Sequence, residues 1–324
     1  MTMSPEQAVW FQTTFEQLVA NVGEAVLGKS RVIRLSLTCM LTEGHLLLED
    51  APGTGKTQLA RAIAATVLGS HSRIQFTPDL LPSDVTGVTI YDQASHKFEF
   101  HQGPIFACIV LADEINRASP KTQSALLEVM EEGHVTVDGV THQAPKPFMV
   151  IATQNPIEQA GTYRLPEAQL DRFLMLTSIG YPDHESTVRI LAGASNRDLA
   201  GSLSALITTD AVTNMAKLAS EVLVDGAVLE YVSRLATETR TAPETRLGVS
   251  VRGALAIIRT AKTWAAAHGR TYVLPDDVKE LLEPVWGHRL ILDPEAEFAG
   301  ATAAGVLARI LADVAAPQER RSVA

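Results

Sequence analysis

One stretch of the chain decides its fold: His45-Leu46-Leu47-Leu48-Glu49 runs directly into Asp50-Ala51-Pro52-Gly53-Thr54-Gly55-Lys56-Thr57. The first part is an apolar run of the length of a buried strand, and residues 58–68, which follow the second part, have the apolar spacing of a helix. A strand, a glycine-containing loop and a helix in this order form a phosphate-binding loop, whose backbone N–H groups turn inward around phosphate oxygens. The sequence therefore predicts a nucleotide-binding protein.

The loop also predicts which ligands it holds. The side chain of Lys56 reaches the β- and γ-phosphates, and the hydroxyl of Thr57 is a ligand for Mg²⁺. Asp50 stands where the general pattern has its first glycine. We expect ATP and Mg²⁺ as cofactors, with the nucleotide bound by Asp50, Ala51, Pro52, Gly53, Thr54, Gly55, Lys56, Thr57 and Gln58.

Two further apolar runs end in polar residues that suit hydrolysis. Residues 109–112 lead into Asp113 and Glu114, and residues 148–152 lead towards Asn155. Adjacent residues at a strand end cannot both face one metal ion, so Asp113 is expected to hold the Mg²⁺ shell while Glu114 orients and deprotonates the attacking water. Asn155 is expected to hydrogen-bond the γ-phosphate or the water. Kinases with this loop need no second acid, so the pair favours hydrolysis.

The pattern of apolar residues changes near residues 181–183. Before this point, short apolar runs alternate with helical segments, as in a parallel sheet that is buried on both faces. After it, helical spacing dominates, so we expect an α/β nucleotide-binding domain over residues 1–182 and an α-helical domain over residues 183–324. The helical segments are residues 210–223, 227–239, 252–268 and 275–286.

Two segments of the first domain are expected to be inserted antiparallel hairpins. Residues 88–101 alternate apolar and polar side chains on both sides of a polar centre, and residues 135–141 turn at Asp138-Gly139. His134 and His142 flank the second hairpin on opposite faces, so we expect no metal site there.

Composition excludes some classes of protein. The 324 residues carry a formal net charge of -10, which works against general attraction to nucleic acid. The longest apolar run, residues 105–112, is too short to cross a membrane, and the first 17 residues lack the pattern of a secretory signal. Cys39 and Cys108 lie in apolar surroundings and are expected to be reduced core residues of a cytoplasmic protein.

Six motifs follow one another along the chain, at residues 48–57, 103–106, 111–118, 123–130, 152–156 and 165–173. With these motifs the sequence, from about residue 22 to residue 290, resembles the MoxR group of AAA+ ATPases. This resemblance implies a P-loop core, made of a parallel sheet with helices on both faces and inserted hairpins, followed by an α-helical lid domain.

The resemblance also implies roles for arginines. Arg172 falls where such ATPases place an arginine finger that reaches the γ-phosphate in a neighbouring subunit. Arg252 falls at the sensor position of the lid, although Ser250-Val251-Arg252 replaces the usual Ser-Pro-Arg. Arg117 and Arg240 match family positions too, but either could simply pair with a carboxylate. Residues 26–28 lie where the family packs the adenine.

The leading hypothesis is a cytoplasmic ATPase that acts as a homo-oligomeric ring, a hexamer by resemblance, and remodels or activates a protein client. The family implies a von Willebrand factor A domain protein as one such partner, and the hairpin at residues 88–101 resembles an insert shared with magnesium chelatase subunits. No nucleic-acid partner and no direct membrane insertion are expected. Two alternatives share the core motifs, namely a nucleic-acid motor or loader, and a binding scaffold that hydrolyses nucleotide slowly.

Overall fold

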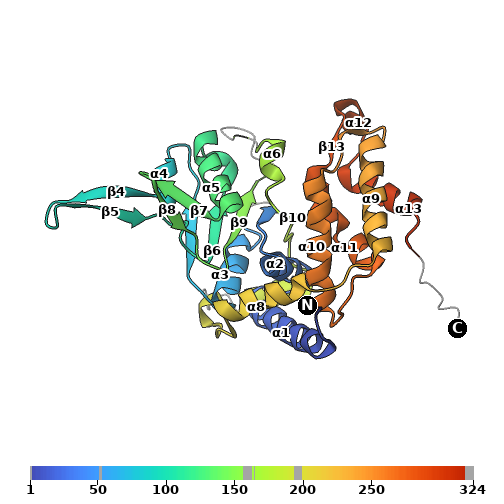
Figure 1. Cartoon of the computed structure of the whole chain (residues 1–324), viewed down its shortest axis with the longest axis horizontal. Helices are drawn as coiled ribbons and strands as arrows, with labels where there is room; N and C mark the ends of the chain where they lie inside the picture. Colours follow the sequence, from blue (N-terminus) through green and yellow to red (C-terminus); the bar gives the residue numbers. More distant parts are fainter. Residues whose placement is uncertain (1, 51–52, 156–162, 164, 193–198, 318–324) are drawn as a thin grey trace. The chain divides into compact units, whose positions relative to one another are not determined.

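The computed structural model describes residues 2–50, 53–155, 163, 165–192 and 199–317 (Figure 1). The chain divides into two compact units. The larger unit comprises Phe15–Phe173 and Thr177–Met215, and the smaller unit comprises Met1–Thr14, Leu174–Leu176 and Ala216–Ala324. Helix α8 (Thr209–Ser220) therefore begins in the larger unit. The functional boundary expected between residues 182 and 183 stays a prediction.

A five-stranded sheet of order β10-β1-β9-β6-β3 carries the phosphate loop. Strand β1 pairs in parallel with β9, β9 with β6, and β6 with β3. Because parallel strands end at the same edge, the sheet gathers the polar residues that follow β1, β6 and β9. The strands are β1 (Leu46–Glu49), β3 (His71–Gln75), β6 (Ile109–Asp113), β9 (Met149–Gln154) and β10 (Met175–Thr177).

Strand β3 is the one member of this sheet that the apolar pattern does not reveal. It lies at the end of the strand order, and Ile74 is its single buried residue. Its other four residues are exposed or half-buried, so the strand carries no apolar run. The four other strands coincide with apolar runs of the sequence, which confirms the α/β prediction.

The helices of the larger unit have local signals at their ends. In α5 (Pro120–Glu132), Ser119 caps the first turn by accepting the N–H of Thr122, Pro120 opens the helix, and Gly133 ends it at φ 68°. The other α-helices of this unit are α2 (Ser30–Leu41), α3 (Lys56–Thr66), α4 (Pro82–Thr86), α6 (Glu167–Leu170) and α7 (His184–Ala192), and α1 (Pro5–Ala25) has residues in both units. In the part of the chain that the structure describes, no helix is long and apolar enough to span a membrane.

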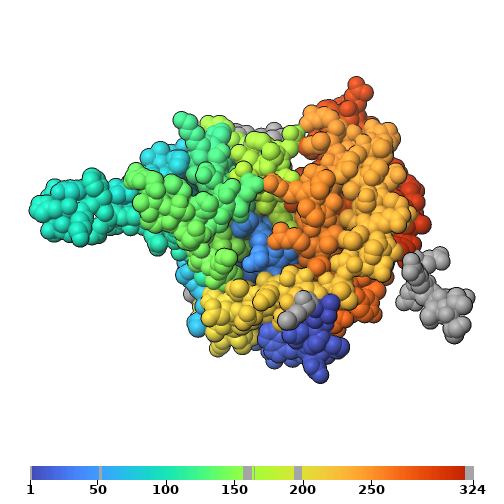
Figure 2. Space-filling view, in the orientation of Figure 1, coloured from blue at the N-terminus to red at the C-terminus, as the bar shows by residue number. Residues whose placement is uncertain are grey.

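Both predicted hairpins are present in the larger unit. Strands β4 (Gly87–Asp92) and β5 (Lys97–Gln102) pair antiparallel and form an arm that projects from this unit (Figures 1 and 2). Strands β7 (His134–Val137) and β8 (Val140–Gln143) are joined by Asp138 and Gly139, both with positive φ, as in a two-residue type I′ turn. Their register confirms that His134 and His142 lie on opposite faces. A further short pair joins β2 (Val67–Leu68) to β11 (Ile207–Thr208).

The smaller unit is mainly helical, as predicted. Its core includes Tyr231 and Trp286, and the Trp286 indole donates a hydrogen bond of 2.8 Å to the Gly253 carbonyl. A short antiparallel pair is also present, which the sequence does not predict because its strands have only two or three residues. The elements are α9 (Gly226–Thr241), α10 (Val251–Ala267), α11 (Pro275–Trp286), α12 (Pro294–Phe298), α13 (Ala303–Asp313), β12 (Thr245–Leu247) and β13 (Ile291–Leu292).

Candidate active site

The phosphate loop turns from β1 into α3 through two glycines in the left-handed region. Gly53 has φ 83°, and Gly55, which caps α3, has φ 98°. A Cβ atom at either position would meet no atom within 4 Å, so it is the backbone conformation rather than space that requires glycine. The Lys56 ammonium donates to the Asp50 carbonyl at 2.9 Å across this turn. Of the predicted nucleotide ligands, Ala51 and Pro52 lie outside the described residues, whereas Thr54, Thr57 and Gln58 lie in the loop and the first turn of α3.

The Asp50 side chain faces the protein backbone. Its carboxylate accepts hydrogen bonds from the N–H groups of Ile179 and Gly180, the latter at 3.2 and 3.3 Å. Asp50 is buried, and these backbone N–H groups satisfy its carboxylate oxygens. It therefore ties the start of the loop to the segment that follows β10. A direct contact of Asp50 with nucleotide stays a prediction.

The strand before the loop is anchored by a buried histidine. His45 Nδ1 accepts the Val150 N–H and His45 Nε2 donates to the Met130 carbonyl, each at 3.0 Å. Both bonds suit a neutral imidazole, and burial lowers the pKa of His45 to about 4. His45 thus joins β1 to β9 and α5 without titrating near neutral pH.

The two acids at the end of β6 are turned towards different partners. Asp113 is buried, whereas Glu114 follows the strand with φ 56°, a left-handed conformation that is costly for a residue with a side chain. Thr153 on β9 stabilises this arrangement, because its hydroxyl donates to Asp113 Oδ1 at 2.6 Å and accepts the Glu114 N–H at 2.9 Å. The left-handed backbone at Glu114 thus gives the two adjacent acids different surroundings. The different roles expected for them from the sequence stay predictions.

Strand β3 supplies contacts to both acids that sequence reasoning missed. Arg73 Nη2 donates to Asp113 Oδ2 at 2.6 Å and to Gln75 Oε1 at 2.9 Å. Gln75 Nε2 in turn donates to Glu114 Oε2 at 2.8 Å, and the same oxygen accepts a bond of 2.9 Å from Arg117. The sequence left two roles open for Arg117, a function at the family position or pairing with a carboxylate, and the structure shows the pairing with Glu114. Only the alternation along β3 could have suggested that Arg73 and Gln75 share a face.

The three other candidate catalytic residues, Asn155, Arg172 and Arg252, lie on different elements of the fold. Asn155 directly follows β9, at the same edge of the sheet as Asp113. Arg172, just after α6, forms an ion pair of 2.9 Å with Glu131 on α5. Arg252 is an exposed residue in the first turn of α10 and belongs to the smaller unit. The phosphate contacts expected of Asn155, Arg172 and Arg252 stay predictions.

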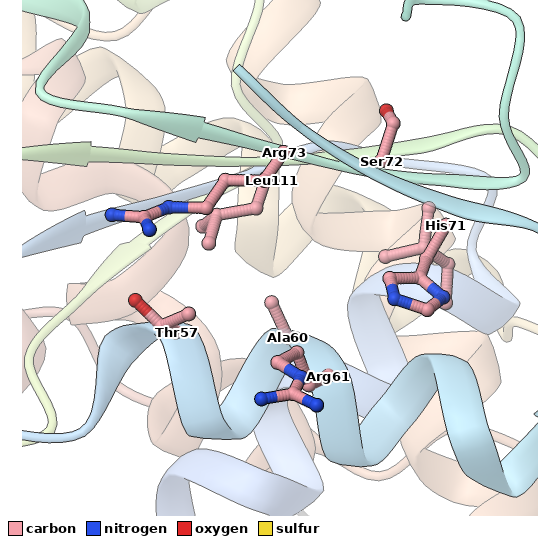
Figure 3. Close-up of a pocket in the computed structure, with 8 residues that line it drawn as sticks. Thr57, Ala60, Arg61, His71, Ser72, Arg73 and Leu111 are labelled. Atoms are coloured by element: carbon pink, nitrogen blue, oxygen red, sulfur yellow. The ribbon is translucent and has the colours of Figure 1, made fainter. Parts of the chain in front are cut away.

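The oxygen atoms at the strand end suit a magnesium ion. Mg²⁺ is usually held by one or two protein oxygens together with phosphate oxygens and water. The Thr57 hydroxyl on α3 and the Asp113 carboxylate on β6 are oxygen ligands of this kind, and the Arg73 side chain that contacts Asp113 lines one cavity together with Thr57 (Figure 3). Among the described residues, no cluster of three or more His, Cys, Asp and Glu side chains provides a metal site made of protein alone. The donor set therefore fits a metal that arrives with a nucleotide.

Fold and site together define a P-loop nucleotide-binding protein of the AAA class. Residues 45–175 match the ATPase family associated with various cellular activities (AAA), and residues 237–310 match the AAA lid domain. A crystal structure of a candidate ATPase from Cytophaga hutchinsonii is similar with a TM-score of 0.90 and 37% sequence identity, over 97% of this chain and 98% of that one.

Two proteins of similar sequence show which family of AAA proteins the chain belongs to. The chain is 46% identical to the uncharacterized protein YeaC of Bacillus subtilis, over 94% of this chain and 95% of that protein. It is 40% identical to the chaperone MoxR1 of Mycobacterium tuberculosis, over 94% of this chain and 83% of that protein. The chain belongs to the MoxR family of AAA ATPases, which confirms the resemblance found in its sequence.

Proposed function

We propose that this chain is a Mg²⁺-dependent ATPase that converts ATP and water to ADP and phosphate. The observation that carries the proposal is the pair of acids at the end of β6, at the sheet edge where the phosphate loop begins. Thr153 contacts the carboxylate of Asp113 and the backbone N–H of Glu114. A protein that only bound nucleotide would need an acid near the metal but no second acid in a strained conformation. Glu114, at φ 56°, is that second acid.

In the proposed reaction each residue has one task. The backbone N–H groups of the loop and the Lys56 ammonium bind the β- and γ-phosphates. Thr57 and Asp113 would hold Mg²⁺, which would offset the negative charge of the phosphates. Asn155 orients the attacking water.

Glu114 takes a proton from this water as the bond from water oxygen to γ-phosphorus forms and the bond from γ-phosphorus to the ADP oxygen breaks. Gln75 and Arg117 both contact Oε2 of Glu114, so they orient the carboxylate through one oxygen. The other oxygen, Oε1, can then receive the proton.

The direct test is Mg²⁺-dependent ATP hydrolysis by purified protein and by two variants. Lys56→Ala should lose nucleotide binding, because the lysine binds charge that is present before the reaction. Glu114→Gln should bind ATP and lose turnover, because only its basicity is removed. Glu128→Gln, at an exposed position of α5, serves as the control and should behave as wild type. Nucleotide affinity retained in Lys56→Ala, or turnover retained in Glu114→Gln, would contradict the assignment.

We further propose that the protein works as a homo-oligomeric ring, a hexamer by family resemblance, in which Arg172 completes the active site of the neighbouring subunit. Within its own subunit Arg172 pairs with Glu131, and the two side chains are 29% and 35% exposed. An ion pair this exposed contributes little free energy, so a phosphate in a neighbouring subunit can compete for the guanidinium. In this scheme residues 1–182 bind the nucleotide, and residues 183–324 form the lid, with Arg252 as its phosphate sensor.

Finally, we propose that ATP hydrolysis remodels or activates a protein client in the cytoplasm. The name of the similar chaperone MoxR1 supports a protein client, and the family resemblance suggests a von Willebrand factor A domain protein. Both cysteines, Cys39 and Cys108, are buried free thiols, in keeping with a reducing compartment. The candidate contact surface is the β4–β5 arm, on which Phe98 is 74% exposed and packs against Tyr91 with ring centroids 5.2 Å apart.

The base of the arm is attached to the second hairpin. The Phe100 ring on β5 stacks on His142 of β8, with centroids 4.0 Å apart and an interplanar angle of 23°. Phe106 contacts both rings edge-on. These ring contacts join the two hairpins through their side chains. A client that moves the arm on binding would therefore also shift β7 and β8.

A further inference from the structure

A cavity of about 370 Å³ lies between helix α3 and the edge of the sheet (Figure 3). Its walls come from three elements of the larger unit, α3 on one side and β3 and β6 on the other. It is lined by Thr57, Ala60, Arg61, His71, Ser72, Arg73, Ile109 and Leu111.

The lining is cationic over an apolar floor. Arg61 on α3 and Arg73 on β3 line the cavity from opposite sides, His71 lines it as well, and none of the eight lining residues is acidic. The Arg73 guanidinium lies above Thr57, whereas the Arg61 guanidinium lies over helix α3 (Figure 3). Ile109 and Leu111, which form the floor, are almost fully buried. Charges next to apolar, poorly hydrated walls interact more strongly than charges in open water. Such a cavity favours an anion with several acceptor oxygens, because guanidinium groups match phosphate geometry.

One end of the cavity meets the candidate active site. Thr57, the predicted Mg²⁺ ligand, is a lining residue, and Arg73 contacts Asp113 at 2.6 Å while it lines the cavity. The cavity therefore adjoins the residues that carry the proposed hydrolysis. An anion in the cavity would compete with Asp113 for Arg73.

We propose that this cavity binds the inorganic phosphate that hydrolysis releases, through Arg61 and Arg73, before the phosphate reaches solvent. The inference rests on the proposed ATPase function. A phosphate ion has roughly the size of two or three water molecules of about 30 Å³ each, so the cavity holds it together with part of its hydration shell. The Ser72 hydroxyl takes no part, since it donates to the Pro104 carbonyl at 2.5 Å.

The test is a calorimetric titration of inorganic phosphate into the full chain saturated with Mg²⁺ and ADP. The ADP fills the phosphate loop, so that loop no longer competes for the titrated phosphate. Arg61→Gln removes one guanidinium without touching Asp113, and it should weaken phosphate binding by about tenfold or more, as expected for a lost charge-assisted hydrogen bond. Arg31→Gln, an exposed arginine on α2 outside the lining, is the matched control and should bind phosphate as wild type.

A second variant tests the cavity by volume rather than charge. The Ala60 methyl group points into the cavity from α3, and Ala60 is 3% exposed (Figure 3). Ala60→Leu fills part of the space without changing any charge, so it should also weaken phosphate binding while ADP affinity is kept. Inhibition of ATP turnover by added phosphate should become weaker in both Arg61→Gln and Ala60→Leu.

The outcomes separate this inference from the proposed function. Phosphate affinity equal to wild type in both Arg61→Gln and Ala60→Leu overturns the inference, and so does the absence of phosphate binding by wild type. If Arg61→Gln instead changes only how activity depends on protein concentration, the cavity receives an acidic side chain of another copy, and the phosphate inference is wrong. Absence of ATP turnover would overturn the proposed function alone, because phosphate titration of nucleotide-free Lys56→Ala still reports on the cavity.

Discussion

Replacement of Thr153 by valine tests whether the bridge between the two acids is needed for catalysis. Valine has nearly the shape of threonine but lacks the hydroxyl. Thr153 is fully buried, and its hydroxyl makes bonds of 2.6 Å to Asp113 Oδ1 and 2.9 Å to the Glu114 N–H. Thr153→Val therefore removes two buried hydrogen bonds at once, one of them to a carboxylate.

The magnitude follows from these two contacts. A buried group that loses its partner costs about 1–3 kcal/mol, so the two lost partners predict a loss of about 2–6 kcal/mol in the free energy of unfolding. Glu114 also loses the bond that supports its left-handed backbone, at φ 56°. If about 1.4–2.8 kcal/mol of this loss appears in the transition state, ATP turnover falls between about tenfold and about a hundredfold. ATP affinity should change little, because the loop residues are untouched.

The assays are steady-state ATP hydrolysis, ATP binding, and chemical unfolding of the same samples. Thr153→Ser keeps the hydroxyl and should retain most of the turnover. Thr260→Val is the matched control, since Thr260 is equally buried but its hydroxyl bonds only to the Ala256 carbonyl of its own helix. Wild-type turnover in a destabilised Thr153→Val protein would refute a catalytic role of the bridge. Equal losses in Thr153→Ser and Thr153→Val would show that the hydroxyl is not the cause.

Three further predictions concern assembly, pH and the projecting arm. Specific activity should rise with protein concentration, and mixing Arg172→Ala with Lys56→Ala subunits should restore hydrolysis; mixtures no more active than the sum of their parts, in protein shown to assemble, would rule out a finger acting in trans. His45 binds a proton near pH 6.5 in the unfolded chain but near pH 4 in the folded one, so stability should be full above pH 6.5 and fall by roughly 3 kcal/mol as the pH approaches 4. The urea midpoint of His45→Asn should depend less on pH over this window, and an unchanged dependence would assign it to other groups. Deletion of residues 91–98 should abolish client binding, measured with a von Willebrand factor A domain protein, and leave ATP turnover intact; unchanged binding would remove the arm from the interface.

Much of this fold can be predicted from the sequence because its signals are local. A strand buried on both faces requires an apolar run, so β1, β6, β9 and β10 are visible without knowledge of their neighbours. The loop is visible because Gly53 and Gly55 must adopt positive φ. Parallel pairing then brings the ends of these strands together, which is why Asp113, Glu114 and Asn155 could be assigned to one site before their positions were known.

The contacts that set the orientation of those residues depend on tertiary structure alone. Strand β3 has one buried side chain, so nothing local marks it as a strand, yet its place beside β6 brings Arg73 and Gln75 to the two acids. Thr153 looks like part of an apolar run until the register of β6 and β9 sets its hydroxyl between Asp113 and Glu114. The sequence by itself thus determined which residues are the candidates for the chemistry, because each is specified by its near neighbours. Only the tertiary structure decided what holds them in place, because partners about 40 residues apart meet through strand order and register.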